Sequence, residues 1–262
     1  MRFSLNSLKR VLMISHYTFK EIIKSKILLN TLFLGFAILT ITYVALSFTY
    51  GEATKISLDF GLGLLTMSSI GIAIFIGVGL LSKEIESRTV YMVISRPVKR
   101  HEFIIGKILG LNLVLMLNIA ILSVFTYLTY FYIGGVFTSL LIWTIFFIML
   151  ESLLVLLLVC LLSLITTQTL TVIISLAVYV TSHGIHTALK TSFTQSQPLL
   201  EQLLKILHYI LPAFYKLNIK SFLLYQQEIA TSYLLGASLH TLFYCLFLVF
   251  LCIYVFKTKD LN

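Results

Sequence analysis

The chain has 262 residues, of which 59% are hydrophobic and 11% charged, and its mean hydropathy is +1.01. Because soluble domains carry roughly 25% charged residues, this composition excludes a globular aqueous fold and predicts an all-α, polytopic membrane protein. The net charge of +9 comes from bases grouped beside hydrophobic blocks, a pattern that favours membrane topology and argues against a nucleic-acid partner. The sequence has no Gly-x-x-x-x-Gly-Lys phosphate loop, so we expect any ATP hydrolysis in another chain.

Residues 1–26 are predicted to form an amphipathic helix that lies on the lipid bilayer as an interfacial elbow. Apolar residues such as Leu12 and Phe19 recur at near-helical spacing, while bases such as Lys9 and Lys20 supply the polar face. A solvated tail without a specific role is the alternative interpretation.

Six segments of about 20 largely apolar residues follow, each long enough to cross a hydrocarbon core of about 30 Å. They are residues 27–48, 60–81, 108–133, 140–165, 170–188 and 233–256. With both ends of the chain inside, 14 of the 19 Lys and Arg residues lie on the cytoplasmic side. The positive-inside rule therefore predicts cytoplasmic termini, in a plasma (cytoplasmic or inner) membrane.

Small residues follow one face of the second span, where Ser69, Ala73 and Gly77 occur at successive fourth positions. Such a stripe allows two membrane helices to approach closely. The sequence therefore predicts a tight helix contact, either within the subunit or with a partner.

Residues 82–107 form a charged cytoplasmic passage between two hydrophobic blocks and hold six of the Lys and Arg residues. Pro97 divides this passage, because the residue before a proline, here Arg96, is driven out of helical geometry. The passage is therefore predicted to consist of two helices with a sharp break between them.

The first of these helices is predicted at residues 84–95. Glu84 and Glu86 would lie in its first turn, where acids suit the helix dipole, and Val93 belongs to its apolar stripe. The second helix is predicted to start near Lys99 and to run into the third span.

Glu151 is the one acid that the sequence places well inside a predicted span, and such a carboxylate indicates a functional site. It is expected near mid-membrane, where it could line a pathway, carry a proton, or accept hydrogen bonds from Thr144, Ser152 or another helix. A protonated and purely structural carboxyl group is the alternative.

His183 and His186 lie three residues apart near the outer end of the fifth span, so they share one helix face. Imidazoles at this spacing are weak candidates for a zinc or copper site, because metal sites usually need more ligands. A structural or interfacial pair is the favoured interpretation, so no metal is expected.

Residues 189–232 form an outer segment that is too long and too apolar for a plain linker. A leucine-rich helix is predicted near residues 199–210, stopped by Pro212. This helix is expected to rest at the outer interface, where the segment either covers the mouth of a pathway or packs passively on the outer leaflet.

The charged passage resembles that of the membrane subunits, or permeases, of type 2 ATP-binding-cassette (ABC) transporters. The matching positions are Glu84, Glu86, Thr89, Arg96, Pro97, Val98, Arg100, Glu102, Gly106 and Lys107. Family members often have Ser where this chain has Lys99 and Gly where it has Arg88. The resemblance extends to the amphipathic N-terminus and the six-span layout, and it looks closest to the branch that includes the nitrous-oxide reductase maturation permease.

The resemblance implies a single permease domain over residues 1–262, whose charged passage places a coupling helix in a cleft of a separate ATPase. The residues that it assigns to this coupling are Glu84, Glu86, Arg88, Thr89, Val93, Arg96, Pro97, Arg100, Glu102 and Lys107. It also implies that the working unit contains two ATPases and a second permease copy or paralogue. ATP and magnesium would bind only to the ATPases, and this chain would hold no cofactor.

We therefore expect a permease subunit of an ATP-driven exporter that performs no covalent chemistry. A mechanotransmission subunit, which passes ATP-driven motion to a partner on the outer side, is the first alternative. The second is an intramembrane enzyme built on Glu151, His183 and His186. That enzyme would need convergent groups, whereas Glu151 is expected near mid-membrane and the histidines near the outer surface.

Overall fold

The computed structural model describes residues 5–24, 26–48, 52–86, 99–225 and 227–258, and within them the chain is helical without strands. The elements are α1 (Leu5–Lys24), α2 (Ile27–Ser47), α3 (Ala53–Glu86), α5 (Arg100–Tyr132), α6 (Ser139–Ile165), α7 (Gln168–Ala188), α8 (Ser192–Gln195), α9 (Pro198–Ile210), η1 (Phe214–Lys216), α10 (Lys220–Leu224) and α11 (Thr231–Thr258). In this part of the chain six helices, α2, α3, α5, α6, α7 and α11, are long and apolar enough to cross a membrane. The predicted all-helical, six-span fold is confirmed.

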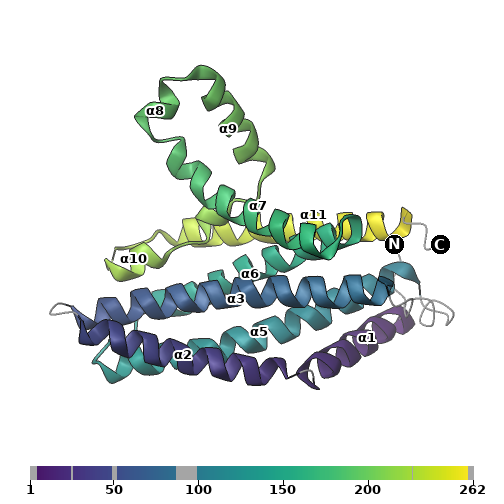
Figure 1. Ribbon diagram of the computed structural model, residues 1–262, viewed down its shortest axis with the longest axis horizontal. Helices are drawn as coiled ribbons and strands as arrows, with labels where there is room; N and C mark the ends of the chain where they lie inside the picture. The colour runs from purple at the N-terminus through teal and green to yellow at the C-terminus, as the bar shows by residue number, and fades with distance from the viewer. Residues whose placement is uncertain (1–4, 25, 49–51, 87–98, 226, 259–262) are drawn as a thin grey trace.

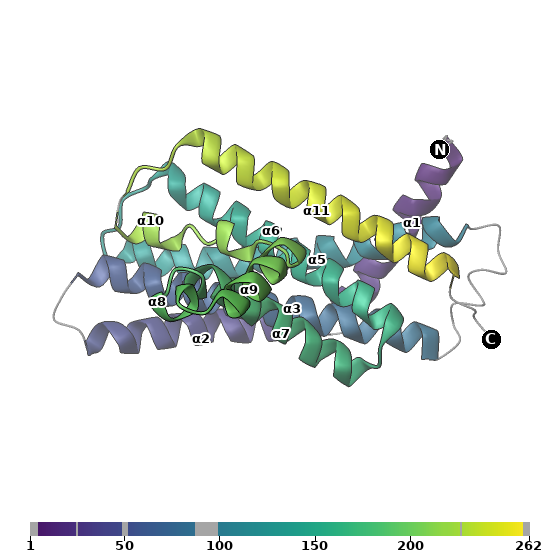
Figure 2. The ribbon, with the colours of Figure 1, turned by 90° about the horizontal axis from the view of Figure 1, so that it is seen from above.

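The helices α3, α5 and α6 form the centre of an elongated bundle, with α2 and α11 on opposite sides and α1 at one end (Figures 1 and 2). Apolar side chains fill this centre, among them the fully enclosed Leu65, Leu111 and Leu156. Large apolar side chains also cover the exterior, as Phe243 does on α11. An apolar exterior of this kind is a surface for lipid.

The small-residue stripe of α3 is buried in the bundle. A Cβ atom added to Gly77 would lie 2.7 Å from Cγ1 of Val159 on α6, so the two backbones can approach only because Gly77 has no side chain. In this structure the close approach joins α3 and α6 of one subunit.

The amphipathic helix α1 packs against the first half of α5, where two glycines let the helices touch. A Cβ atom added to Gly106 would lie 2.7 Å from Cβ of Ile14, and one added to Gly110 would lie 2.8 Å from the carbonyl oxygen of Ser15. Leu12 and other apolar residues of α1 lie away from this contact and are exposed. The helix is therefore attached to the bundle along one face and leaves an apolar face for lipid.

Helix boundaries beside the charged passage differ in part from the expectation. α3 continues to Glu86, five residues beyond the predicted end of the second span, because no helix breaker lies between. Glu84 and Glu86 therefore end α3 and do not begin a separate helix. α5 begins at Arg100 with Lys99 as its N-cap, which agrees with the predicted start. Outside the described residues lie positions 87–98, which include the coupling residues Arg88, Thr89, Val93, Arg96 and Pro97.

The outer segment has two parts with different roles. α9 forms where a helix was predicted, but together with α8 it stands away from the bundle, and none of its side chains is buried (Figure 1). The following residues turn back onto α3, α6 and α7, and Phe214, Leu217 and Ile219 are almost completely buried there. The part of the outer segment that covers the bundle is therefore residues 214–224 and not α9.

Gly110→Ala is expected to lower the thermal stability of the protein, because the added methyl group would meet Thr18 and the Ser15 carbonyl at less than 3 Å. Overpacking typically costs about 1–3 kcal/mol, which matches or exceeds the roughly 1 kcal/mol that alanine gains over glycine in a helix. Thermal unfolding in detergent should therefore give a lower Tm than for the wild type.

Gly236→Ala is the matched control, because a Cβ atom added to this α11 glycine has no neighbour within 4 Å. This variant should keep or raise the Tm. A Gly110→Ala protein at least as stable as Gly236→Ala would contradict the close contact of α1 with α5.

Candidate functional site

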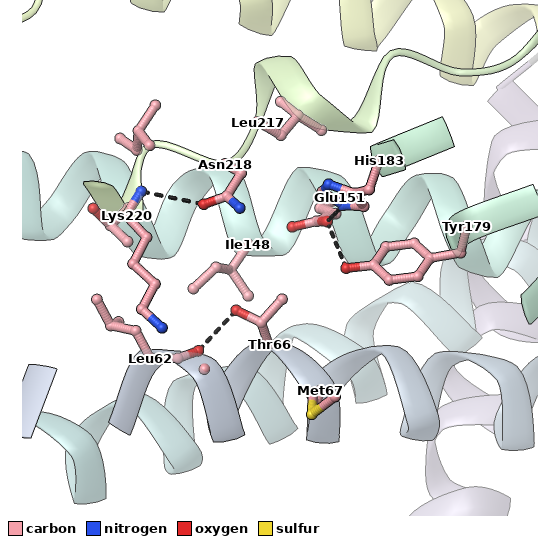
Figure 3. Close-up of a pocket in the computed structure, with 13 residues that line it drawn as sticks. Leu62, Thr66, Met67, Ile148, Glu151, Tyr179, His183, Leu217, Asn218 and Lys220 are labelled. Atoms are coloured by element: carbon pink, nitrogen blue, oxygen red, sulfur yellow. Dashed lines mark hydrogen bonds and ion pairs between the residues drawn. The ribbon is translucent and has the colours of Figure 1, made fainter. Parts of the chain in front are cut away.

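A pocket of about 170 Å³ lies between α3, α6, α7 and the residues that lead into α10 (Figure 3). Its polar lining includes Thr66 from α3, Glu151 from α6, His183 from α7, and Asn218 and Lys220 from the outer segment. The fold therefore gathers polar side chains from four parts of the sequence in one place.

Glu151 lies in the wall of this pocket with only 3% of its surface exposed. Its Oε1 atom accepts a hydrogen bond from the Tyr179 hydroxyl at 3.0 Å and lies 2.9 Å from Nε2 of His183. Tyr179 and His183 are four residues apart on α7, so both side chains extend from one face of that helix. A single carboxylate oxygen thus connects α6 to α7.

The fully buried ring of Phe214, in η1, supports this polar cluster. Its centroid lies 5.3 Å from that of Tyr179 and 6.1 Å from that of His183, and it is nearly parallel to the imidazole. The Ser182 hydroxyl donates a hydrogen bond to the carbonyl oxygen of Pro212, which fixes the start of η1 on α7. The outer segment therefore holds the two polar side chains of α7 in place.

The expected separation of Glu151 from the histidines is wrong for His183, which contacts Glu151 directly. The reason is the tight turn between α6 and α7. Glu151 lies 15 residues before Thr166 and His183 lies 17 residues after it, so an antiparallel hairpin brings them to the same depth. Thr144, Ser152 or another helix was expected to donate a hydrogen bond to Glu151. The donor is Tyr179 on another helix, α7, whereas the Thr144 and Ser152 hydroxyls donate to backbone carbonyls of their own helix.

His186 takes no part in this cluster. Its ring stacks on Tyr215 with centroids 4.2 Å apart and an angle of 7° between the planes, and His208 of α9 lies on the same tyrosine. Burial raises the pKa of Tyr215, so its phenol stays neutral in this stack. The residues with described placement contain no group of three His, Cys, Asp or Glu side chains that could hold a metal.

An ion pair borders the pocket on the side of α3. Nζ of Lys220 lies 2.6 Å from Oδ1 of Asp59, and the lysine side chain passes close to Gly63. This pair connects α10 to α3 and neutralises the lysine, so Lys220 does not provide a free positive charge for Glu151.

A second enclosed carboxylate lies at the start of α5, next to the charged passage. Glu102 is fully buried, and its Oε1 atom lies 2.9 Å from Nη2 of Arg10 on α1. Its Oε2 atom accepts a hydrogen bond from the backbone N–H of Lys99 at 3.2 Å. Glu102 therefore both caps α5 and binds α1 to it.

Further contacts extend this junction to α11. A guanidinium nitrogen of Arg100 donates to the carbonyl oxygen of Lys257 at 3.2 Å. On α1, Oε2 of Glu21 lies 3.7 Å from Nζ of Lys107, which is almost fully buried. The last residues of the charged passage thus connect α1, α5 and α11, and we call this set of contacts the α5 junction.

Sequence reasoning missed several residues of both sites. Tyr179 could have been found, because it precedes His183 by four positions and shares its helix face. Arg10 and Phe214 gave no such signal, since Arg10 is 92 residues from its partner and Phe214 is one of 20 phenylalanines.

A protein-family profile described as "ABC-2 family transporter protein" matches residues 12–261 of the chain. The chain belongs to the ABC-2 transporter family. A comparison with curated proteins finds no significant match. Together with the six long apolar helices, membership of the family establishes a multi-pass membrane protein that serves as a permease subunit of an ABC transporter.

In this ABC-2 permease, Arg10→Gln is expected to destabilise the α5 junction, because it leaves the buried Glu102 carboxylate without its charged partner. An unsatisfied buried acceptor costs about 1–3 kcal/mol, so the Tm in detergent should fall by several degrees.

Lys205→Gln is the control, since Lys205 pairs with Glu201 on α9, where the lysine side chain is exposed and the glutamate side chain is partly exposed. Exposed ion pairs contribute about 0–1 kcal/mol, so this variant should unfold close to the wild-type temperature. A similar Tm for the Arg10→Gln and Lys205→Gln proteins would show that Glu102 does not need Arg10.

Proposed function

We propose that this permease is the membrane subunit of an ATP-driven exporter and that residues 82–107 dock on a separate ATPase subunit. The observation that carries the proposal is the α5 junction. In the last part of the charged passage, Glu102, Arg100 and Lys107 bind α5 to α1 and α11. A displacement of the passage would therefore act on three helices together and not on one flexible loop.

In the proposed mechanism, two ATPase subunits close on ATP and magnesium and push the charged passages of two permeases. The rigid junction turns this push into a movement of α5, and α3 and α6 follow because they pack against it. The pocket is lined by the first halves of α3 and α6, remote from the junction, where such a movement can change its width. The chain itself would contribute no cofactor and no covalent step.

The polar cluster gives an intramembrane enzyme less support than a transport pathway. An enzyme is no longer excluded by the distance between Glu151 and His183, because the two side chains are in contact. An enzyme of this kind would also need a nucleophile beside them. The hydroxyl groups of Thr66 and Thr144, which line the pocket, donate to carbonyl oxygens of their own helices. For the alternative of a mechanotransmission subunit, the surface available to an outer-side partner would include α8 and α9, which stand away from the bundle and are small.

We also propose that this chain is closest to the branch that includes the nitrous-oxide reductase maturation permease. The charged passage supports this proposal. The positive-inside distribution of Lys and Arg supports cytoplasmic termini in the inner membrane. The orientation and the ATPase docking can be tested without knowing the cargo.

Orientation can be measured with single cysteines, because Cys160, Cys245 and Cys252 are buried and should react little. A membrane-impermeant maleimide applied to intact cells is expected to label Gln197→Cys, which is exposed in the outer segment, and not Lys99→Cys. Labelling of Lys99→Cys in intact cells would reverse the proposed topology. Permeabilised cells, in which both positions should react, provide the control.

ATPase docking can be measured by co-purification of the ATPase subunit of the same transporter with the tagged permease. Glu86→Ala is expected to reduce the recovered ATPase about tenfold, since a lost charge-assisted hydrogen bond costs about 1.5–3 kcal/mol and 1.4 kcal/mol is a factor of ten. Glu201→Ala, an acid removed from α9, should leave recovery unchanged. Undiminished recovery with Glu86 and Arg100 both replaced by alanine would overturn the docking proposal.

A further inference from the structure

The two oxygen atoms of the Glu151 carboxylate differ in their surroundings. Both Tyr179 and His183 contact Oε1, and within the described residues no hydrogen bond reaches Oε2. Figure 3 shows that this second oxygen points away from Tyr179, into the pocket and toward Asn218. A carboxylate that is 97% buried thus has one oxygen held by the protein and one available to a ligand.

The charges around the pocket favour a cation as that ligand. On α3 and the outer segment, Asp59 and Lys220 neutralise one another, and on α7 the facing group is His183. Among the described residues no Lys or Arg side chain pairs with Glu151, so no permanent positive charge of the protein lies against this carboxylate. A bare carboxylate at this depth is costly, whereas a bound cation restores neutrality.

The size and chemistry of the pocket select the kind of cation. Its volume of about 170 Å³ is below the roughly 300–1,000 Å³ of sites for drug-sized ligands, so it admits a small headgroup. Calcium takes six to eight oxygen ligands and structural zinc takes four N, S or O ligands, and the described lining offers one free carboxylate oxygen. A quaternary ammonium group donates no hydrogen bonds, so it needs only the negative charge of that oxygen and a polarisable wall such as Met67 and Tyr179.

We propose that Oε2 of Glu151 binds the ammonium group of an organic cation, as the first contact of the pocket with cargo. This inference rests on the proposed transport function and adds the chemical class of the cargo to it. Tyr179 and His183 act as positioning residues, because they hold Oε1 and so aim Oε2 at the pocket. The ammonium group can belong to a free small amine or to a lipid headgroup.

The test uses the purified full chain without an ATPase, in phosphatidylglycerol nanodiscs, which contain no ammonium headgroup. Choline chloride is titrated against sodium chloride at constant ionic strength, and the Tm is measured. A ligand that binds the folded state raises the Tm in a saturable way. Wild type and the Glu201→Gln control should show this rise, and the isosteric Glu151→Gln variant should lose it.

Asp59→Asn provides a second test that leaves Glu151 intact. Removal of the aspartate charge leaves the Lys220 ammonium uncompensated beside the pocket, so the choline concentration at half-maximal stabilisation should rise at least several-fold. Tyr179→Phe should weaken the response less than Glu151→Gln does, because His183 still holds Oε1.

A second arm identifies the source of the ammonium group. If a lipid headgroup is bound, nanodiscs of phosphatidylcholine should raise the wild-type Tm without added choline, and Glu151→Gln should again remove the effect. If a free amine is bound, only dissolved choline should act. Stabilisation of wild type and Glu151→Gln to the same extent, or no choline-dependent shift in wild type, would overturn the proposal.

The failure of this inference is distinguishable from a failure of the proposed function. Loss of choline stabilisation with intact ATPase co-purification would remove the cation site and leave the transporter role. Choline stabilisation without any bound ATPase would leave the site and contradict the coupling.

Discussion

The α5 junction depends on the buried carboxylate of Glu102, which binds α1 to the start of α5. This carboxylate is completely enclosed, so its charge must be compensated within the protein, and Arg10 of α1 and the backbone of Lys99 supply that compensation. The nearby Gly106 and Gly110 let α1 lie close enough for Arg10 to reach it. These contacts attach the amphipathic helix α1 to α5, so α1 is not held by the bilayer surface alone.

A second enclosed carboxylate, Glu151, occupies the pocket in the wall of the same bundle, but its environment is different. Glu102 uses both oxygens for contacts within the protein, which suits a permanent joint. Glu151 uses one oxygen to hold α7 and keeps the other turned to the pocket, which suits a site that exchanges its partner. We therefore propose different roles for the two acids, with mechanical attachment at Glu102 and cargo recognition at Glu151.

Hydrophobicity and charge in the sequence were sufficient to predict the six spans and the start of α5 near Lys99, because each is a local pattern. The end of α3 was misjudged, since nothing between positions 81 and 86 breaks a helix. Pairings across the bundle were beyond local patterns, as the 92 residues between Arg10 and Glu102 illustrate. The Glu151–His183 contact could have been predicted from the sequence. The two residues are nearly equally far along the chain from the turn at Thr166, which implies equal depth in a hairpin.

We propose that motion of the charged passage reaches the pocket through the α5 junction. It is tested most directly by the maleimide labelling rate of Asn218→Cys, an exposed pocket residue, in the permease–ATPase complex with and without ATP. We expect a several-fold change in labelling rate on addition of ATP, and loss of that change when Arg10→Gln breaks the junction. An unchanged rate in a complex that hydrolyses ATP, or a change that persists in Arg10→Gln, would contradict it.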